Sequence, residues 1–293
     1  MLTYKKYIIL KEEEEQKVSS AGKEWHENHP VDHMNIVDHF DKAPKGEVHN
    51  GKSWYKDAHE YANTVSRSTG LPRHTVAGLT SVYSPQRDWH NNMIDASRVA
   101  RRKTPIGGKT QKPYYKYGKA FAGEQQSSSA QRLLSGEHYD KVITGQKTHA
   151  FASLIDHGGD KDPKNPHVVV DRHAHSVASG ARITDAAFSA AGLKSKKGYN
   201  KVKQAYIQAT DHINSRSGAK PGDPNHIHPH QLQAVTWLVR QRLNSKEDSE
   251  GGKDPTALAK SGKARETAKA KWKNYSGTWH PGVSHLFKEE EDI

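Results

Sequence analysis

The sequence predicts a mostly α-helical protein without a sheet. Apolar residues recur at helical spacing along most of the chain, and no segment shows the alternation of apolar and polar residues that a half-buried strand requires. The hydrophobic share is 33% and the aromatic share is 8%, both low for a globular chain of 293 residues. We therefore expect a helical bundle whose two ends are disordered or loosely docked.

Three stretches in the first half of the chain place their apolar residues on one helical face. They are residues 54–65, residues 74–83 and residues 89–100. The second helix is expected to end at Ser84-Pro85, because proline disfavours the helical conformation in the residue before it. Residues 103–128 mix basic, aromatic, Gly and Pro residues without a period, which predicts a loop against a ligand or solvent.

The second half of the chain predicts five further helices. They are a short helix at about 129–135, a helix that starts near Gly145, a helix from Asp171 to Gly180 behind the apolar run 168–170, a helix over 202–213, and a helix over 232–243 behind Pro229. Proline is favourable in a first helical turn, because the N–H that it lacks would have no partner within the helix.

Composition divides the chain into four segments. Residues 1–12 form a leader, and residues 13–52 form a linker or N-terminal extension, in which residues 42–52 are rich in Pro, Gly and charge. Residues 53–245 form the helical domain, and residues 246–293 form a basic and aromatic tail.

The charge balance favours a polyanionic partner, most simply a nucleic acid. Lys and Arg number 45 against 33 for Asp and Glu, a net charge of +12. Residues 1–15 carry −1 and residues 289–293 carry −4, so residues 16–288 carry +17. The alternative is a basic surface that only keeps the protein in solution. The lack of cysteine excludes disulfides, thiolate nucleophiles and Cys-containing zinc sites, and no apolar run approaches the ~20 residues of a membrane span.

Three segments resemble, in order, parts of one enzyme family. They are Ala77–Gln86 (AGLTSVYSPQ), Ile143–Ala150 (ITGQKTHA) and Val168–Val177 (VVVDRHAHSV). They resemble parts of the helix-hairpin-helix DNA glycosylases of the endonuclease III class. The first is similar to that family's early helix and its Ser-(Ala/Pro)-Gln loop, and the second to its hairpin. The third is similar to its Val-Asp-Thr-His-x-x-Arg-Val stretch. The hairpin departs from the full Leu-Pro-Gly-Val-Gly pattern, and Ser176 stands where arginine is usual.

This resemblance implies a helix-hairpin-helix glycosylase-like bundle that acts on duplex DNA without a cofactor. It implies that Asp171 is the catalytic carboxylate and that Lys147 stands where bifunctional members place a lysine nucleophile. The chemistry of base excision supports the first role, because cleavage of the C1′–N bond develops positive charge on the sugar, which a fixed anion in a water-poor pocket stabilises. The alternative for Asp171 is a plain helix N-cap.

The hairpin is also expected to contact the DNA backbone. Lys147 either attacks C1′ or contacts a phosphate at a helix N-terminus, and the contact is the commoner role for a lysine there. Gly145 lets the backbone approach a phosphate closely. Gln146 and Thr148 in the same hairpin, and Arg172 beside Asp171, are predicted DNA contacts as well.

The remaining predicted DNA contacts lie on two loops. Gln86 either fills the space left by an extruded base or is an ordinary exposed turn residue. Lys109, Lys112 and Lys116 are predicted phosphate contacts on the loop 103–128. Trp89 and Tyr83 flank Gln86, but their helical spacing favours core packing over base stacking.

Histidine spacing raises the question of a metal site, and we predict none. His173 and His175 point apart if they lie on a helix. His226, His228 and His230 would share a face in an extended segment, but only Asp223 is a nearby carboxylate, so a weakly basic surface near DNA explains them better.

The first twelve residues, MLTYKKYIILKE, resemble something different. They are similar to the capsid-targeting peptide of internal head proteins in T-even-like phages, with Leu10-Lys11-Glu12 matching the Leu-x-Glu site of the prohead protease. The resemblance implies cleavage after Glu12 and a phage protein of the host cytoplasm that is packaged in the virion. The sequence thus leaves two alternatives to a glycosylase, namely a non-enzymatic DNA-binding head protein and a base-hypermodification enzyme on the same fold.

Overall fold

The computed structural model describes residues 20–249, except for residues 86, 88, 106–123, 161, 163 and 192–194. Over this part the chain is mostly helical and has no strand, which confirms the predicted α class. None of the helices in it is long and apolar enough to cross a membrane. The chain folds as two compact units, with boundaries after Gly51 and after Val169.

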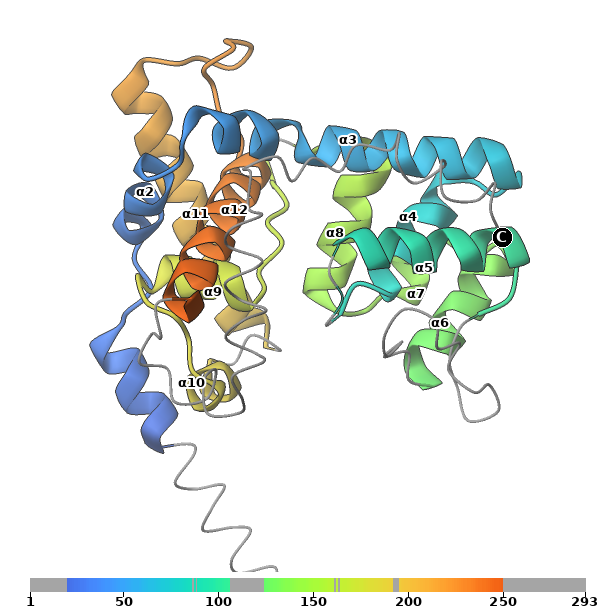
Figure 1. The fold of residues 1–293 in the computed structure, drawn as a ribbon, viewed down its shortest axis with the longest axis horizontal. Helices are drawn as coiled ribbons and strands as arrows, with labels where there is room; N and C mark the ends of the chain where they lie inside the picture. The colour runs from blue at the N-terminus through green and yellow to red at the C-terminus, as the bar shows by residue number, and fades with distance from the viewer. Residues whose placement is uncertain are drawn as a thin grey trace, which may run out of the picture. The chain divides into compact units, whose positions relative to one another are not determined.

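Unit 1 joins residues 20–51 to residues 170–249. It contains a first helix over residues 20–28, α2 (His33–Asp41), the beginning of α3 (Lys45–Thr69), α9 (Arg172–Ala178), α10 (Asp185–Ala190), α11 (Lys196–Ser217) and α12 (Pro229–Ser249). Helices α2, α9, α11 and α12 pack against one another around fully buried side chains such as Ile36, Tyr206 and Leu232 (Figure 1).

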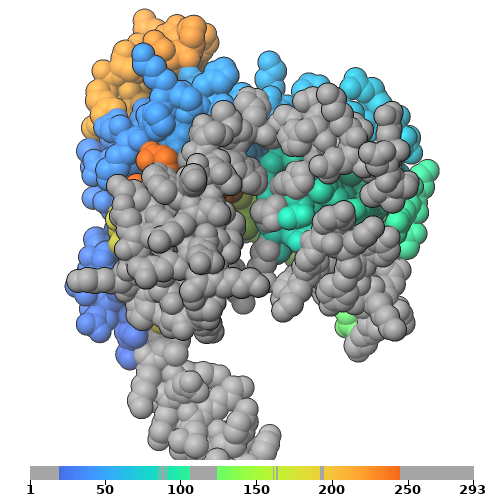
Figure 2. All heavy atoms as spheres, viewed as in Figure 1, coloured from blue at the N-terminus to red at the C-terminus, as the bar shows by residue number. Residues whose placement is uncertain are grey.

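An ion pair joins α2 to α11 at the surface of unit 1. Arg216, near the end of α11, donates to both carboxylate oxygens of Asp41 at 2.8 and 2.5 Å. These hydrogen bonds lower the pKa of the Asp41 carboxyl below its usual value. Figure 2 shows orange atoms of α11 and blue atoms of the N-terminal helices side by side on this surface. Both partners are exposed, so the pair orients the two helix ends more than it stabilises the fold.

Unit 2 is built around α4. It contains the rest of α3, then α4 (Arg73–Val82), α5 (Trp89–Arg102), α6 (Glu124–Leu134), α7 (Tyr139–Val142) and α8 (Gln146–His157). Helix α4 packs against α5, α6, α7 and α8, and every residue from Thr75 to Val82 is buried (Figure 1). The rings of Trp54, Trp89 and Phe151 lie within 6.1 Å of one another and form an aromatic core. This position of Trp89 confirms core packing, as does the burial of Tyr83.

The helices predicted from apolar spacing are confirmed. Residues 54–65 lie in α3, residues 89–100 lie in α5, and residues 74–82 lie in α4, whose C-cap is Tyr83. Helix α4 thus ends before Ser84-Pro85 as expected. Residues 202–213 and 232–243 lie in α11 and α12. The helix expected at about 129–135 is α6, which begins earlier, at Glu124, because its first turns are polar and show no apolar period.

The predicted linker over residues 42–52 is wrong, because α3 begins at Lys45. Much of the wider extension 13–52 is also helical, over residues 20–28 and in α2. The sequence of residues 42–52 shows no apolar pattern, because the residues that this segment buries are polar residues and a glycine. Glu47 is 1% exposed and pairs with Arg242 at 2.7 Å, and Gly51 lies against the backbone of Val235. At the other end, α12 continues to Ser249, past the predicted start of the tail at 246.

Candidate active site

Asp171 lies at the start of α9, in unit 1. The apolar residues 168–170 before it are buried, and Asp171 itself has extended backbone angles, so the chain enters the helix at this residue. Its Oδ1 accepts a hydrogen bond from the Ala174 N–H at 2.9 Å, which is the geometry of an N-cap. The side chain is half-buried, and Oδ2 accepts no hydrogen bond from the described residues. The N-cap role is therefore correct, and it leaves one carboxylate oxygen for a ligand.

Two buried tyrosines of α11 lie near this carboxylate. The Tyr199 hydroxyl accepts a hydrogen bond from the Val170 N–H at 3.4 Å, and the Tyr206 hydroxyl lies 3.1 Å from Thr236 Oγ1. Burial raises the pKa of both phenols above its usual value, and the negative charge of Asp171 raises it further. Both phenols thus stay protonated and neutral beside the negative charge of Asp171.

The two residues that follow Asp171 contact aromatic rings. The Arg172 guanidinium forms an ion pair with Asp185 of α10 and lies over the ring of Phe188, 4.8 Å from its centroid. The His173 ring meets Trp237 of α12 edge-on at 6.5 Å. Arg172, a predicted DNA contact, is thus held by α10.

The predicted hairpin lies in unit 2, between α7 and α8. Ile143 ends α7, and Gly145 is the N-cap of α8, with no side chain to cap the first N–H groups of the helix. Thr148 Oγ1 donates to the Gly145 carbonyl at 3.0 Å. Gln146, Lys147 and Thr148 are half-buried and begin the helix. An uncapped helix N-terminus with a lysine in its first turn suits an anion such as a phosphate.

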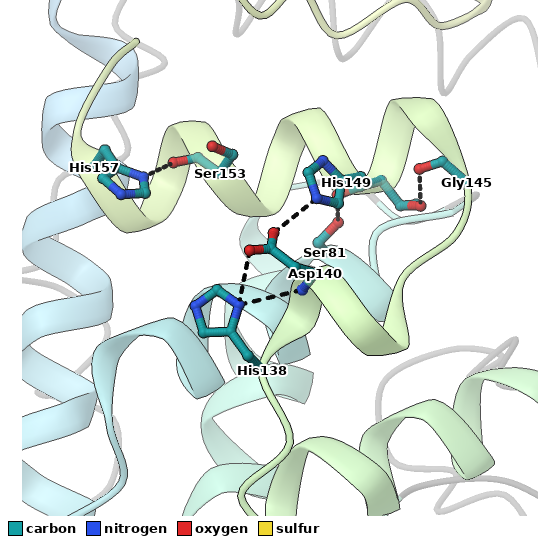
Figure 3. A network of polar contacts seen from close by, with 8 residues as sticks. Ser81, His138, Asp140, Gly145, His149, Ser153 and His157 are labelled. Carbon is teal, nitrogen blue, oxygen red and sulfur yellow. Dashed lines mark hydrogen bonds and ion pairs between the residues drawn. The ribbon is translucent and has the colours of Figure 1, made fainter. Parts of the chain in front are cut away.

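A polar network holds the hairpin in place (Figure 3). Asp140 lies between two imidazoles, with Oδ1 2.8 Å from His149 Nε2 of α8 and Oδ2 3.2 Å from His138 Nδ1 just before α7. Ser81 of α4 donates to the Thr148 carbonyl at 2.5 Å. The network therefore ties both helices of the hairpin to each other and to the buried helix α4.

The predicted site residues fall into two groups. Asp171 and Arg172 belong to unit 1, while Lys147 and the rest of the hairpin belong to unit 2. Gln86, Lys109, Lys112 and Lys116 lie outside the described residues, as do the leader 1–12 and residues 250–293.

The histidines of unit 1 form ring contacts. His226 and His228 have ring centroids 4.8 Å apart, and His228 and His230 are 5.6 Å apart. Within the described chain, no group of three or more His, Asp or Glu side chains could hold a metal ion.

Sequence reasoning missed two features around α9. His175 is buried against His26 of the first helix, with ring centroids 5.2 Å apart. Phe188 of α10 is exposed beside Arg172. Phe188 belongs to no motif, and the sequence singled out His175 only within the segment 168–177 and as a possible metal ligand. Each residue gains its role from a contact with a separate helix, which no local pattern indicates.

The comparison with known proteins identifies one family. A family model described as a family of unknown function, DUF7178, matches residues 18–245. No curated protein and no solved structure matches the chain.

Proposed function

Since the chain belongs to the DUF7178 family, whose function is unknown, we propose from its own residues that it is a DNA glycosylase-like enzyme. It would flip a base out of duplex DNA and cleave the N-glycosidic bond. The proposal rests on the resemblance of the three segments, on the basic charge of residues 16–288, and above all on the geometry of Asp171.

The Asp171 carboxylate is the observation that carries the proposal. One of its oxygens accepts from the Ala174 N–H, which orients the side chain, while the other oxygen accepts no hydrogen bond from the described residues. Cleavage of the C1′–N bond makes the sugar cationic, and an anion already held in position stabilises that transition state without reorganising. The nearby phenols of Tyr199 and Tyr206 are buried and neutral, so no positive charge from them offsets the carboxylate.

The hairpin supplies the second half of the proposal. The uncapped N-terminus of α8 would bind a backbone phosphate, with Lys147 as a further contact or as an amine nucleophile. The two roles of Lys147 differ in outcome. Borohydride traps a covalent protein–DNA adduct only if the amine attacks C1′, and Lys147→Ala would then lose the adduct, while Lys141→Ala on α7 would keep it. Base release without an adduct would assign the attack to water.

The test of the proposed function replaces Asp171 by asparagine. Asparagine still caps a helix, so Asp171→Asn is expected to fold, to lose base release, and to bind DNA as tightly as the wild type or slightly more tightly. Asp32→Asn is the matched control, because Asp32 caps α2 in the same unit by accepting from the Met34 N–H at 2.9 Å. Substrates should include duplexes with modified bases, scored for free base and alkali-labile sites. Full activity in Asp171→Asn would refute the assignment.

The leader supports a second candidate, a non-enzymatic DNA-binding protein packaged in a phage head. Residues 1–12 carry the capsid-targeting resemblance and lie outside the family match, which begins at residue 18. Protein recovered from virions would then begin at Glu13, as mass spectrometry can establish. A chain that keeps residues 1–12 in virions, or is missing from them, would exclude packaging by this route.

A further inference from the structure

Phe188 is an exposed aromatic ring on α10. Its side chain is 37% exposed, and Met34, at 40%, is the other large hydrophobic side chain exposed in the described part of the chain. Exposing a phenyl ring to water costs free energy that burial would recover. An exposed ring beside a candidate functional residue therefore suggests a surface that binds a ligand.

The rest of α10 is occupied by the first helix. His26 Nε2 lies 2.8 Å from the Ala187 carbonyl. A side chain at Gly22 would place its Cβ 2.6 Å from the Ala186 carbonyl and from Ala190 Cβ. Three of the six residues of α10 thus pack against residues 20–28, and Phe188 is left at the surface.

One face of the Phe188 ring is already used. The guanidinium of Arg172 lies over it, 4.8 Å from the centroid, and the ion pair with Asp185 fixes that guanidinium. A guanidinium plane and a phenyl ring are the two kinds of surface on which unstacked nucleobases stack. Arg172 directly follows Asp171, so this pair lies at the same helix end as the carboxylate assigned to the sugar.

We propose that Phe188 and Arg172 form a stacking subsite for an unstacked nucleobase of DNA. That this base lies next to the scissile bond rests on the proposed function, because only the proposed role of Asp171 puts the scissile bond here. The stacking itself does not, since a ring and a guanidinium would hold a base whether or not the bond is cut.

The test compares two single-stranded oligonucleotides of equal length, one of thymidines and one of abasic sugar-phosphate units. Both carry the same phosphates, so the salt-dependent part of the affinity is the same, and their difference reports base contacts. Phe188→Ala is expected to reduce the preference for the thymidine strand about tenfold, within the range of single stacking contacts. Phe188→Tyr should restore it, because tyrosine keeps a ring of the same size. Met34→Ala is the matched control and should behave as the wild type.

Each result has a defined meaning. An unchanged preference in Phe188→Ala, or an equal loss in Phe188→Tyr, would overturn the subsite. Base release by Phe188→Ala is then measured separately under saturating duplex. If Phe188→Ala loses the strand preference, Phe188→Tyr keeps it, and the wild type releases no base, the proposed function fails and the subsite stands. If the wild type releases base and Phe188→Ala keeps its strand preference, the subsite fails and the function stands.

Discussion

His175 makes the stability of unit 1 depend on pH. Its ring is 3% exposed, and burial, with the nearby His26 and Lys201, lowers its pKa to about 4. In the unfolded chain the same imidazole takes up a proton near pH 6.5. Above pH 6.5 both states are neutral and nothing is lost, whereas between pH 6.5 and about 4 the unfolded state binds the proton more readily and the free energy of unfolding falls.

The predicted loss from this one residue is about 2 kcal/mol at pH 5. His39 and His74 also have lowered pKa values from burial, so the whole protein loses more than this. Urea unfolding of wild type and His175→Gln at pH 7.5 and pH 5 isolates the contribution, because the variant cannot take up that proton. His212→Gln, at an exposed position, is the control. The same pH dependence in wild type and His175→Gln would show that His175 is protonated equally in both states.

Helix α3 contains two glycines with opposite roles. A Cβ at Gly51 would lie 2.4 Å from Val235 Cγ2 and 2.6 Å from the Val235 backbone N and Cα, whereas a Cβ at Gly46 would meet nothing within 4 Å. Because Gly51 contacts backbone atoms of α12, a side chain there must push the two helices apart.

Alanine substitutions should therefore change stability in opposite directions. Gly51→Ala is expected to lower the free energy of unfolding by about 1–3 kcal/mol. Gly46→Ala should raise it by less than about 1 kcal/mol, because alanine is the better helix former. Both values come from urea unfolding at pH 7.5, above the histidine effect. Equal stability of the two variants would argue against close packing of α3 on α12.

The same glycine explains what the sequence could and could not predict about the helices. Where a helix buries apolar side chains, as at Trp54, Tyr61 and Val65, the spacing alone located it. Where a helix packs through glycine and a buried ion pair, as at Gly51 and Glu47, the composition looked like a linker. The spacing of apolar residues indicates which side chains are buried, but it does not indicate where two helix backbones are in contact.

The candidate site divides in the same way. Asp171 and Gly145 were located because each begins a helix after a recognisable segment, and both lie at helix N-termini. No sequence pattern identified the aromatic residues around the site. Helix α11 brings Tyr199 and Tyr206 near Asp171, and α10 brings Phe188 to Arg172, only in the folded chain.

At the scale of the whole molecule, the net charge and the candidate site predict separate contributions to the proposed DNA binding. The +17 of residues 16–288 favours any duplex, and its effect should fall with salt at a log–log slope of roughly −0.9 per phosphate contacted. A base-flipping site adds a preference that salt does not explain. It should favour a mismatched or abasic duplex, where unstacking costs a few kcal/mol less.

Two sets of variants should separate these effects. Neutralising Lys109, Lys112 and Lys116 together is expected to flatten the salt slope by up to about 2.7, and to leave the preference for abasic over intact duplex unchanged. Gln86→Ala should do the reverse, because the loop after Pro85 is the one expected to enter the vacated stack. Each set is the control for the other, with affinities measured by fluorescence anisotropy from ~0.05 to ~0.2 M salt. If wild-type protein binds intact and abasic duplexes equally at ~0.15 M salt, across several opposite bases, the non-enzymatic head protein becomes the better account of this chain.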